Sequence, residues 1–293
     1  VGSEEPIDED LRAELPSAGS CLLYGDSGLP GNEGLLAPDK VVFRNGWEDD
    51  DLYMLINLRF TGWHRYKSTN AIVLIYAGQE LVKEQYTQNF ISWLPVGRAM
   101  VRDKRIAIEQ LNTLLIPRTG LDAVLNTIID WFGPYAQDPP FYSEIESFGT
   151  SAEVDHVRTT VKDWHGWQFE RSIFFYHDGP VFILDNASSK KKSEAAINLH
   201  LSEGYYLNEN KAINPETDVD FLFITQENGT LFGVEKDNSL LVQYQSEELG
   251  TLNLLTVILP EEWRKAEFVS YVEGVITIKI NNQIIEYPVG EIG

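Results

Sequence analysis

Short apolar runs recur along the chain from Lys40 onward, and Gly, Asn or Asp residues separate one run from the next. Segments such as Ala71–Ala77 and Val275–Ile280 have the length of strands and are rich in β-branched and aromatic residues. The separators HDG, ENG, VEG and INN are turn signals, and their spacing is typical of antiparallel hairpins rather than of alternating strands and helices. The pattern therefore predicts an all-β fold, a large antiparallel β-sandwich. The other predicted strands are one that begins at Lys40, and Leu52–Phe60, Leu111–Pro117, Gln168–Tyr176, Pro180–Asn186, Ala196–Leu201, Asp220–Thr225, Thr230–Val234, Leu240–Tyr244, Leu252–Leu259, Glu267–Val272 and Gln283–Tyr287.

One segment between the strands has a helical pattern instead. Its apolar residues follow i, i+3, i+4 spacing between the turn signals RTG and GP, and they are Leu121, Val124, Leu125, Ile128, Ile129 and Phe132. This spacing predicts one inserted amphipathic helix over about residues 121–133. Such a helix either packs on a sheet or presents a face to another domain, and Trp131 is the residue that would mark a docking face.

The first 34 residues differ in composition from the rest. They are acidic and rich in Gly, Ser and Pro, with one apolar run, CLLYG, that is long enough for a strand. We expect residues 1–34 to be an acidic linker that leads into a single β-sandwich domain over residues 35–293. Because the chain starts without Met, we expect a mature form or a fragment of a longer protein. No apolar run approaches the roughly 18 residues of a membrane helix, so we expect no membrane insertion.

The chain is strongly acidic, since 45 Asp and Glu residues outnumber 23 Lys and Arg residues and leave a net charge of −22. This charge repels a phosphate backbone and argues against nucleic acid as a partner. It also disfavours a polyanionic sugar, unless a local group of cations or a missing domain supplies positive potential. Cys21 is the single cysteine, which excludes an intrachain disulfide and a cysteine-based zinc site.

The first candidate for chemistry is the stretch WHRYKSTNAIVLIYAG, Trp63–Gly78, where polar residues stand directly before an apolar strand. In an extended backbone His64, Tyr66 and Ser68 share one face, and Arg65 adds a cation beside them. Removing a proton from a carbon next to a carboxylate requires a base, a group that neutralises the carboxylate, and an acid for the leaving oxygen. The stretch contains each of these residue types, although they are also ordinary at the polar rim of a sheet.

The second candidate is the segment DWHGWQFERSIFFYHDG, in which Trp164 and Trp167 flank His165. Aromatic faces beside polar groups suit stacking on sugar rings, and a buried tryptophan pair that seals one end of the sandwich explains the same letters. His177 is interpreted as a turn residue. The acidic run Trp47–Asp51 lacks the ligand spacing of a calcium loop and is interpreted as a solvated turn.

The order of these segments resembles the C-terminal β-sandwich region of heparinase II/III-like polysaccharide lyases. The segments that carry the resemblance are FRNGW, WHRYKSTNAIVLIYAG, LNTLLIP, ERSIFFYHDGPVFILDNAS and AAINLHL, and together they cover roughly Val41–Leu201. The resemblance implies an extended β-sandwich, or supersandwich, and a secreted or periplasmic protein. It further implies an N-terminal α/α-toroid, absent from this chain, that supplies the remaining catalytic groups.

The family's H-x-H-x-D stretch is carried over residue by residue. Its first histidine, at the catalytic cleft, matches His64, whereas the second histidine is replaced by Tyr66 and the aspartate by Ser68. The family's metal ligands match Tyr66, Lys83 or Glu84, and Leu111. We therefore expect no metal and no other cofactor.

Two functions follow from these observations. The first is β-elimination on a uronate-containing polysaccharide, and the alternative is a non-catalytic carbohydrate-binding or interaction domain derived from the same fold. For the lyase, the expected catalytic residues are His64 and Tyr66. The expected substrate-binding residues are Trp63, Arg65, Asn70, Trp164 and His165.

Overall fold

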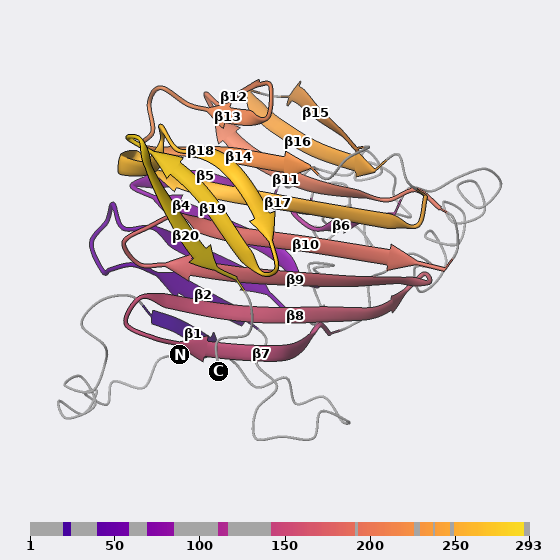
Figure 1. Cartoon of the computed structure of the whole chain (residues 1–293). Coiled ribbons are helices and arrows are strands. Elements are labelled where there is room, and N and C mark those ends of the chain that lie inside the picture. Colours follow the sequence, from indigo (N-terminus) through magenta and orange to yellow (C-terminus); the bar gives the residue numbers. More distant parts are fainter. Residues whose placement is uncertain are drawn as a thin grey trace, which may run out of the picture.

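A computed structural model describes residues 20–24, 40–58, 69–84, 111–116, 142–190, 193–225, 229–236, 238–246 and 249–289. These residues form three antiparallel sheets, which confirms the all-β prediction (Figure 1). Within the described ranges the one helical element is a short 3₁₀ turn, Glu261–Trp263. The helix predicted over about residues 121–133 lies outside the described residues, as does most of the acidic segment 1–34.

The first sheet has nine strands. Eight follow the spatial order β1-β2-β3-β4-β5-β11-β16-β15, and β6 pairs with β11. Their bounds are β1 Ser20–Tyr24, β2 Lys40–Arg44, β3 Tyr53–Asn57, β4 Ala71–Ala77, β5 Gln79–Lys83, β6 Leu114–Leu115, β11 Ala196–Glu203, β15 Gly229–Lys236 and β16 Ser239–Ser246. Residues 21–24 of the CLLYG run thus lie in β1, which pairs with β2.

The second sheet has eight strands in the order β12-β13-β14-β17-β10-β9-β8-β7. Their bounds are β7 Glu144–Thr150, β8 Val154–Trp164, β9 Trp167–Tyr176, β10 Val181–Ser189, β12 Tyr206–Asn208, β13 Lys211–Ile213, β14 Val219–Thr225 and β17 Thr251–Pro260. Hairpins connect β7 through β10 in sequence order, as the HDG turn signal between β9 and β10 predicted. The strands β7, β8, β12 and β13 have no counterpart among the predicted runs.

The main core lies between the first and second sheets. Alternate residues of each strand face it, as in β16, where Leu240, Val242 and Tyr244 are buried. The rings of Phe43 and Phe175 stack across the two sheets with centroids 5.6 Å apart. Each such fully buried side chain contributes about 1.5–3 kcal/mol of hydrophobic stabilisation.

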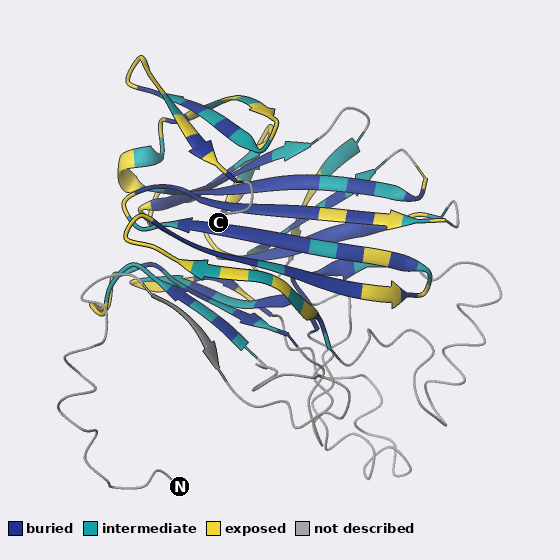
Figure 2. Ribbon diagram, turned by 60° about the horizontal axis from the view of Figure 1, so that its bottom comes forward, coloured by how far each residue is buried: buried dark blue, intermediate teal, exposed yellow. Residues whose placement is uncertain are grey.

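A third sheet lies over one end of the outer face of the second sheet (Figure 2). It consists of β18 Glu267–Val272, β19 Val275–Ile280 and β20 Gln283–Pro288. Ile276 and Ile278 of this sheet belong to a second apolar core that also contains Phe182 and Val257. The second sheet is therefore covered on both faces at this end, which explains the continuous burial of residues 254–259 in β17.

Candidate functional site

The predicted site residues divide into two groups. Trp63, His64, Arg65 and Tyr66 lie outside the described residues, whereas Asn70, Trp164 and His165 lie within them. The last residue of β3, Asn57, pairs with Ala71 of β4, so the segment that carries His64 leaves and re-enters the first sheet at the same end.

Asn70 stands at the start of β4 and is fully buried, with a left-handed φ of 53°. Its side-chain Oδ1 accepts a hydrogen bond of 2.7 Å from the Thr159 hydroxyl on β8. Its main-chain oxygen accepts two more, from the Thr113 hydroxyl at 3.1 Å and from Nη1 of Arg171 at 2.9 Å. In this placement Asn70 ties the first sheet to the second, and its contact with a substrate remains a prediction.

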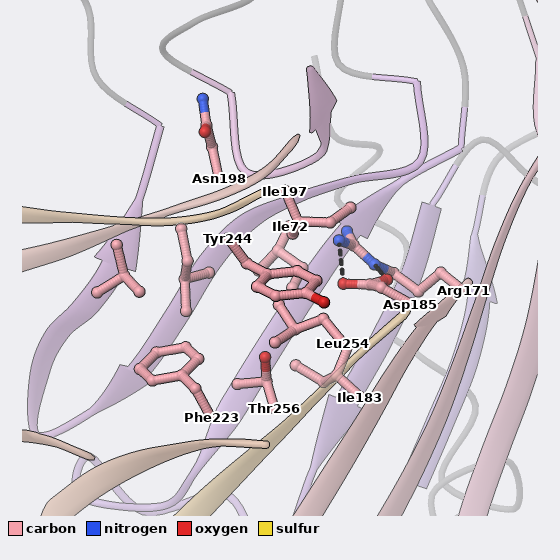
Figure 3. A pocket seen from close by; sticks show the side chains of 12 residues that line it. Ile72, Arg171, Ile183, Asp185, Ile197, Asn198, Phe223, Tyr244, Leu254 and Thr256 are labelled. Atoms are coloured by element: carbon pink, nitrogen blue, oxygen red, sulfur yellow. Dashed lines mark hydrogen bonds and ion pairs between the residues drawn. The ribbon is translucent and has the colours of Figure 1, made fainter. Parts of the chain in front are cut away.

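Arg171 on β9 and Asp185 on β10 form an ion pair across two neighbouring strands of the second sheet. The guanidinium is bidentate, since Nε lies 2.6 Å from Oδ1 and Nη2 lies 3.0 Å from Oδ2 (Figure 3). Nη1 donates to the main-chain oxygen of Asn112 at 3.1 Å in addition to that of Asn70. Both side chains are only 2% exposed, so these interactions are screened little by solvent.

A small cavity of about 10 Å³ lies beside this pair in the main core. Figure 3 shows that aliphatic side chains such as Ile72 and Ile183, the Tyr244 ring and the Arg171–Asp185 pair line it. A space of this size holds about one water molecule, so it is far too small for a sugar ring. This cavity is therefore not a carbohydrate-binding site.

Asn112 connects the ion pair to His200 on β11. The Asn112 amide nitrogen donates to the main-chain oxygen of Ile72 at 2.8 Å, which fixes the orientation of the amide. Its Oδ1 then accepts from the main-chain nitrogen of His200 at 2.7 Å and lies 2.9 Å from the ring Nδ1. Because Oδ1 only accepts, Nδ1 of His200 carries a proton. Both side chains are buried. In the sequence, LNT and NLHL contributed only to the family resemblance, and neither Asn112 nor His200 was predicted as a site residue.

The second predicted cluster is a hairpin tip between β8 and β9. His165 and Gly166 have φ values of 54° and 87°, the left-handed conformation at both central positions that a type I′ turn requires. Trp164 and Trp167 are each 1% exposed, and Nε1 of Trp167 donates to the Ser193 hydroxyl at 3.1 Å. This placement agrees with the alternative interpretation, a buried tryptophan pair, and leaves His165 as the exposed member of the cluster.

Glu84 follows β5 and is 3% exposed. Burial raises the pKa of its carboxyl to about 8, and its Oε1 has no hydrogen-bond partner among the described residues. The carboxyl is therefore protonated at neutral pH. Leu111, which stands where the resemblance puts a histidine ligand, is fully buried and has no donor atom, so the residues present do not fit a three-ligand zinc site.

The described part of the chain contains no cluster of three or more His, Cys, Asp or Glu side chains that could hold a metal ion. In the same part, no helix has the length and apolar character needed to cross a membrane.

The sheet order defines a class of protein, an extended antiparallel β-sandwich. Within this class the chain resembles heparinase III, with a TM-score of 0.63 and 14% identity to one solved structure. For heparan sulfate lyase HepC from Pedobacter heparinus the TM-score is 0.61 at 13% identity, and for a further heparinase III it is 0.59 at 12% identity.

These matches cover most of this chain but less than half of each heparinase. The first match covers 87% of this chain but 42% of that heparinase III, and the HepC match covers 86% of this chain and 41% of that protein. The chain thus spans about two fifths of the length of the structures that it resembles. No protein-family model and no curated protein sequence matches it.

Proposed function

We propose that this chain is the β-sandwich portion of a polysaccharide lyase that cleaves a uronate-containing polymer by β-elimination. The observation that carries the proposal is the heparinase III-like fold, which covers about two fifths of the solved heparinases. The remaining length leaves room for an N-terminal α/α-toroid in a longer parent protein. That toroid would face the end of the first sheet at which β3 ends and β4 begins.

In this function the segment between β3 and β4 supplies the chemistry. His64 acts as the base or stabilises the developing charge when the proton next to the uronate carboxylate is removed, and Tyr66 lies beside it. Arg65 neutralises the carboxylate, which lowers the cost of forming the carbanion. As the double bond forms, the glycosidic oxygen leaves and takes up a proton. Trp63 and the exposed His165 are the remaining candidates for substrate contacts, because Asn70 and Trp164 are buried in the described structure.

A non-catalytic carbohydrate-binding or interaction domain is the second candidate. Two observations favour it, namely the net charge of −22 and the replacement of a metal-ligand position by the buried Leu111. A domain that has lost part of the family's site retains the fold without the chemistry.

The test uses the full-length protein and a panel of uronate polymers, with the ultraviolet absorbance of the unsaturated product as the readout. We expect the wild type to release product from at least one polymer and His64→Ala to release almost none. Tyr271→Ala is the matched control, because Tyr271 is exposed on β18 in the third sheet. Binding of a polymer without product formation would favour the second candidate, and equal rates for wild type and His64→Ala would rule out catalysis by His64.

A further inference from the structure

A tryptophan and an arginine lie together on the first sheet, where β2 ends and β3 begins. Trp47, in the turn between these strands, is 59% exposed. The Arg44 guanidinium lies over its ring, with Cζ 3.8 Å from the ring centroid, and Cζ is 5.4 Å from the centroid of Tyr53. The guanidinium therefore holds the indole ring by a cation–π contact while much of the ring surface stays open to solvent.

Polar and aromatic side chains continue from Arg44 across the sheet in one row. Arg44 pairs with Tyr53, and Tyr53 pairs with Tyr76 of β4. Tyr76 in turn pairs with Glu80 of β5. Paired residues point to the same face, and because the next residue, Met54, belongs to the core, this row lies on the outer face. Neighbouring strands are about 4.8 Å apart, so the row spans about 14 Å.

The turn that carries Trp47 is fixed by main-chain hydrogen bonds. The Asn45 nitrogen donates to the Leu52 oxygen at 3.2 Å, which closes the turn. The Gly78 nitrogen, in the turn between β4 and β5, donates to the Asp49 oxygen at 3.1 Å. The two turns are thus tied to each other. Groups that are held in place before a ligand arrives lose little freedom when it binds.

The guanidinium of Arg44 has donors to spare. Its Nε is enclosed without a hydrogen-bond partner, and among the described residues its contacts are the two aromatic rings. The carboxylates of Glu48, Asp49 and Asp50 are exposed in the same turn, whereas Oδ2 of Asp51 accepts from the Glu48 main-chain nitrogen at 2.6 Å. The surface around the indole ring therefore combines guanidinium donors with carboxylate acceptors.

We propose that Trp47, Arg44 and this row form a binding subsite for an uncharged pyranose ring of an oligosaccharide. The apolar face of a sugar ring stacks on an exposed indole, and sugar hydroxyls both donate and accept hydrogen bonds. The carboxylates of the turn repel a uronate. The subsite goes beyond the proposed function, because it lies at the opposite end of β3 from Asn57, where the segment with His64 leaves the sheet.

The experiment measures binding by calorimetry with three probes on the full chain. Two are uncharged, a tetramer of glucose and a tetramer of N-acetylglucosamine, and the third is a tetramer of galacturonate. Wild type is compared with Trp47→Ala, Trp47→Phe and Arg44→Gln. Phe232→Ala is the matched control, because Phe232 is a 44% exposed aromatic residue on β15, at the other edge of the same sheet. Thermal midpoints verify that each variant is folded.

We expect wild type to bind at least one uncharged tetramer more tightly than the galacturonate tetramer. Trp47→Ala raises the Kd about tenfold or more, whereas Trp47→Phe and Arg44→Gln raise it by smaller factors and the control leaves it unchanged. The bound tetramer slows amide exchange at residues 45–53 and leaves β18–β20 unchanged.

Three results would overturn the proposal: no binding of either uncharged tetramer, tighter binding of the galacturonate tetramer, or wild-type affinity in a folded Trp47→Ala variant. None of these measurements requires cleavage. A wild type that binds an uncharged tetramer but cleaves no polymer would therefore support the subsite while it contradicts the proposed lyase function.

Discussion

The Nε2 atom of His177 lies 2.9 Å from Oδ2 of Asp155, and its Nδ1 lies 3.1 Å from the main-chain oxygen of Ala152. The Ala152 oxygen only accepts, so Nδ1 must be the donor in that contact. The contact between Nε2 and Asp155 then requires one further proton, held either by the imidazole or by the carboxyl. His177, interpreted from the sequence as a turn residue, therefore joins the turn after β9 to the turn before β8 through Ala152, and to β8 itself through Asp155.

This pair predicts a pH-dependent contribution to stability. Burial raises the pKa of Asp155 above its ordinary 3.8, with His177 and His156 acting in the opposite direction. Since the folded state then holds the proton more tightly than the unfolded state, the free energy of unfolding falls as the pH rises from 3.8 through the raised value. Asp155→Asn replaces the titrating donor by an amide and should make that region of the pH profile flatter. Thermal midpoints measured across pH check this, and an unchanged profile in Asp155→Asn would show that Asp155 does not cause this pH dependence.

Glu84 gives a second pH prediction with a wider window. Its pKa rises from 4.5 in the unfolded chain to about 8 in the folded protein, so its contribution to stability is lost progressively between these two values as the pH increases. Each unit of pKa difference corresponds to about 1.4 kcal/mol. Glu84→Gln should therefore be more stable than wild type above pH 8, by more than about 1 kcal/mol, and similar to it below pH 4.5. Denaturant titrations at several pH values provide the measurement, and a variant less stable than wild type at high pH contradicts the assignment.

Asn70 allows backbone conformation and side-chain contact to be separated. Asn70→Gly keeps the left-handed φ at low cost but loses the hydrogen bond from Thr159. Asn70→Ala loses the same hydrogen bond and in addition adopts the left-handed φ only with strain. We expect Asn70→Ala to lower the free energy of unfolding by about 2–3 kcal/mol and Asn70→Gly by about 1 kcal/mol less. Equal losses in chemical denaturation would mean that φ is not the dominant constraint.

The replaced ligand position predicts that zinc is not part of the folded protein. Leu111 has no metal-binding atom, and the protonated Glu84 carboxyl is a poor ligand. Elemental analysis of purified protein should find zinc well below one equivalent, and a chelator should leave the thermal midpoint unchanged. Stoichiometric zinc that survives dialysis would contradict the residue-by-residue comparison with the family's ligands.

The apolar runs predicted the fold where burial and hydrophobicity agree. Val275–Ile280 was predicted with its observed bounds, because alternate isoleucines mark its buried face. The strand β8 was missed, because it reads as polar although most of it is buried. Its buried polar side chains have hydrogen-bond partners far away in the sequence: Thr159 donates to Asn70, and Asp155 contacts His177. A local sequence pattern does not indicate such pairs.

The candidate site was predictable to a smaller extent. The Arg171–Asp185 pair left a signal in the sequence, since the two opposite charges stand in apolar strands and face each other in the hairpin register set by the HDG turn. The links from Arg171 to Asn70 and Asn112 left none, because they run through main-chain oxygens from positions 101 and 59 residues away. The sequence around Trp164 and Trp167 is compatible with either exposed or buried side chains, and only the packing of the sheets shows that both are buried.

The third sheet imposes an order on folding. The outer face of the second sheet displays Phe182, Val257 and Leu259, but the strands that cover them are the last of the described chain to be synthesised. Until β20 is complete, that surface is exposed to solvent and to other nascent chains, which is the condition under which partly folded proteins aggregate. Truncation after Pro260 should therefore yield insoluble protein, so the soluble fraction of such a chain on expression reports how far the sandwich depends on its C-terminal sheet.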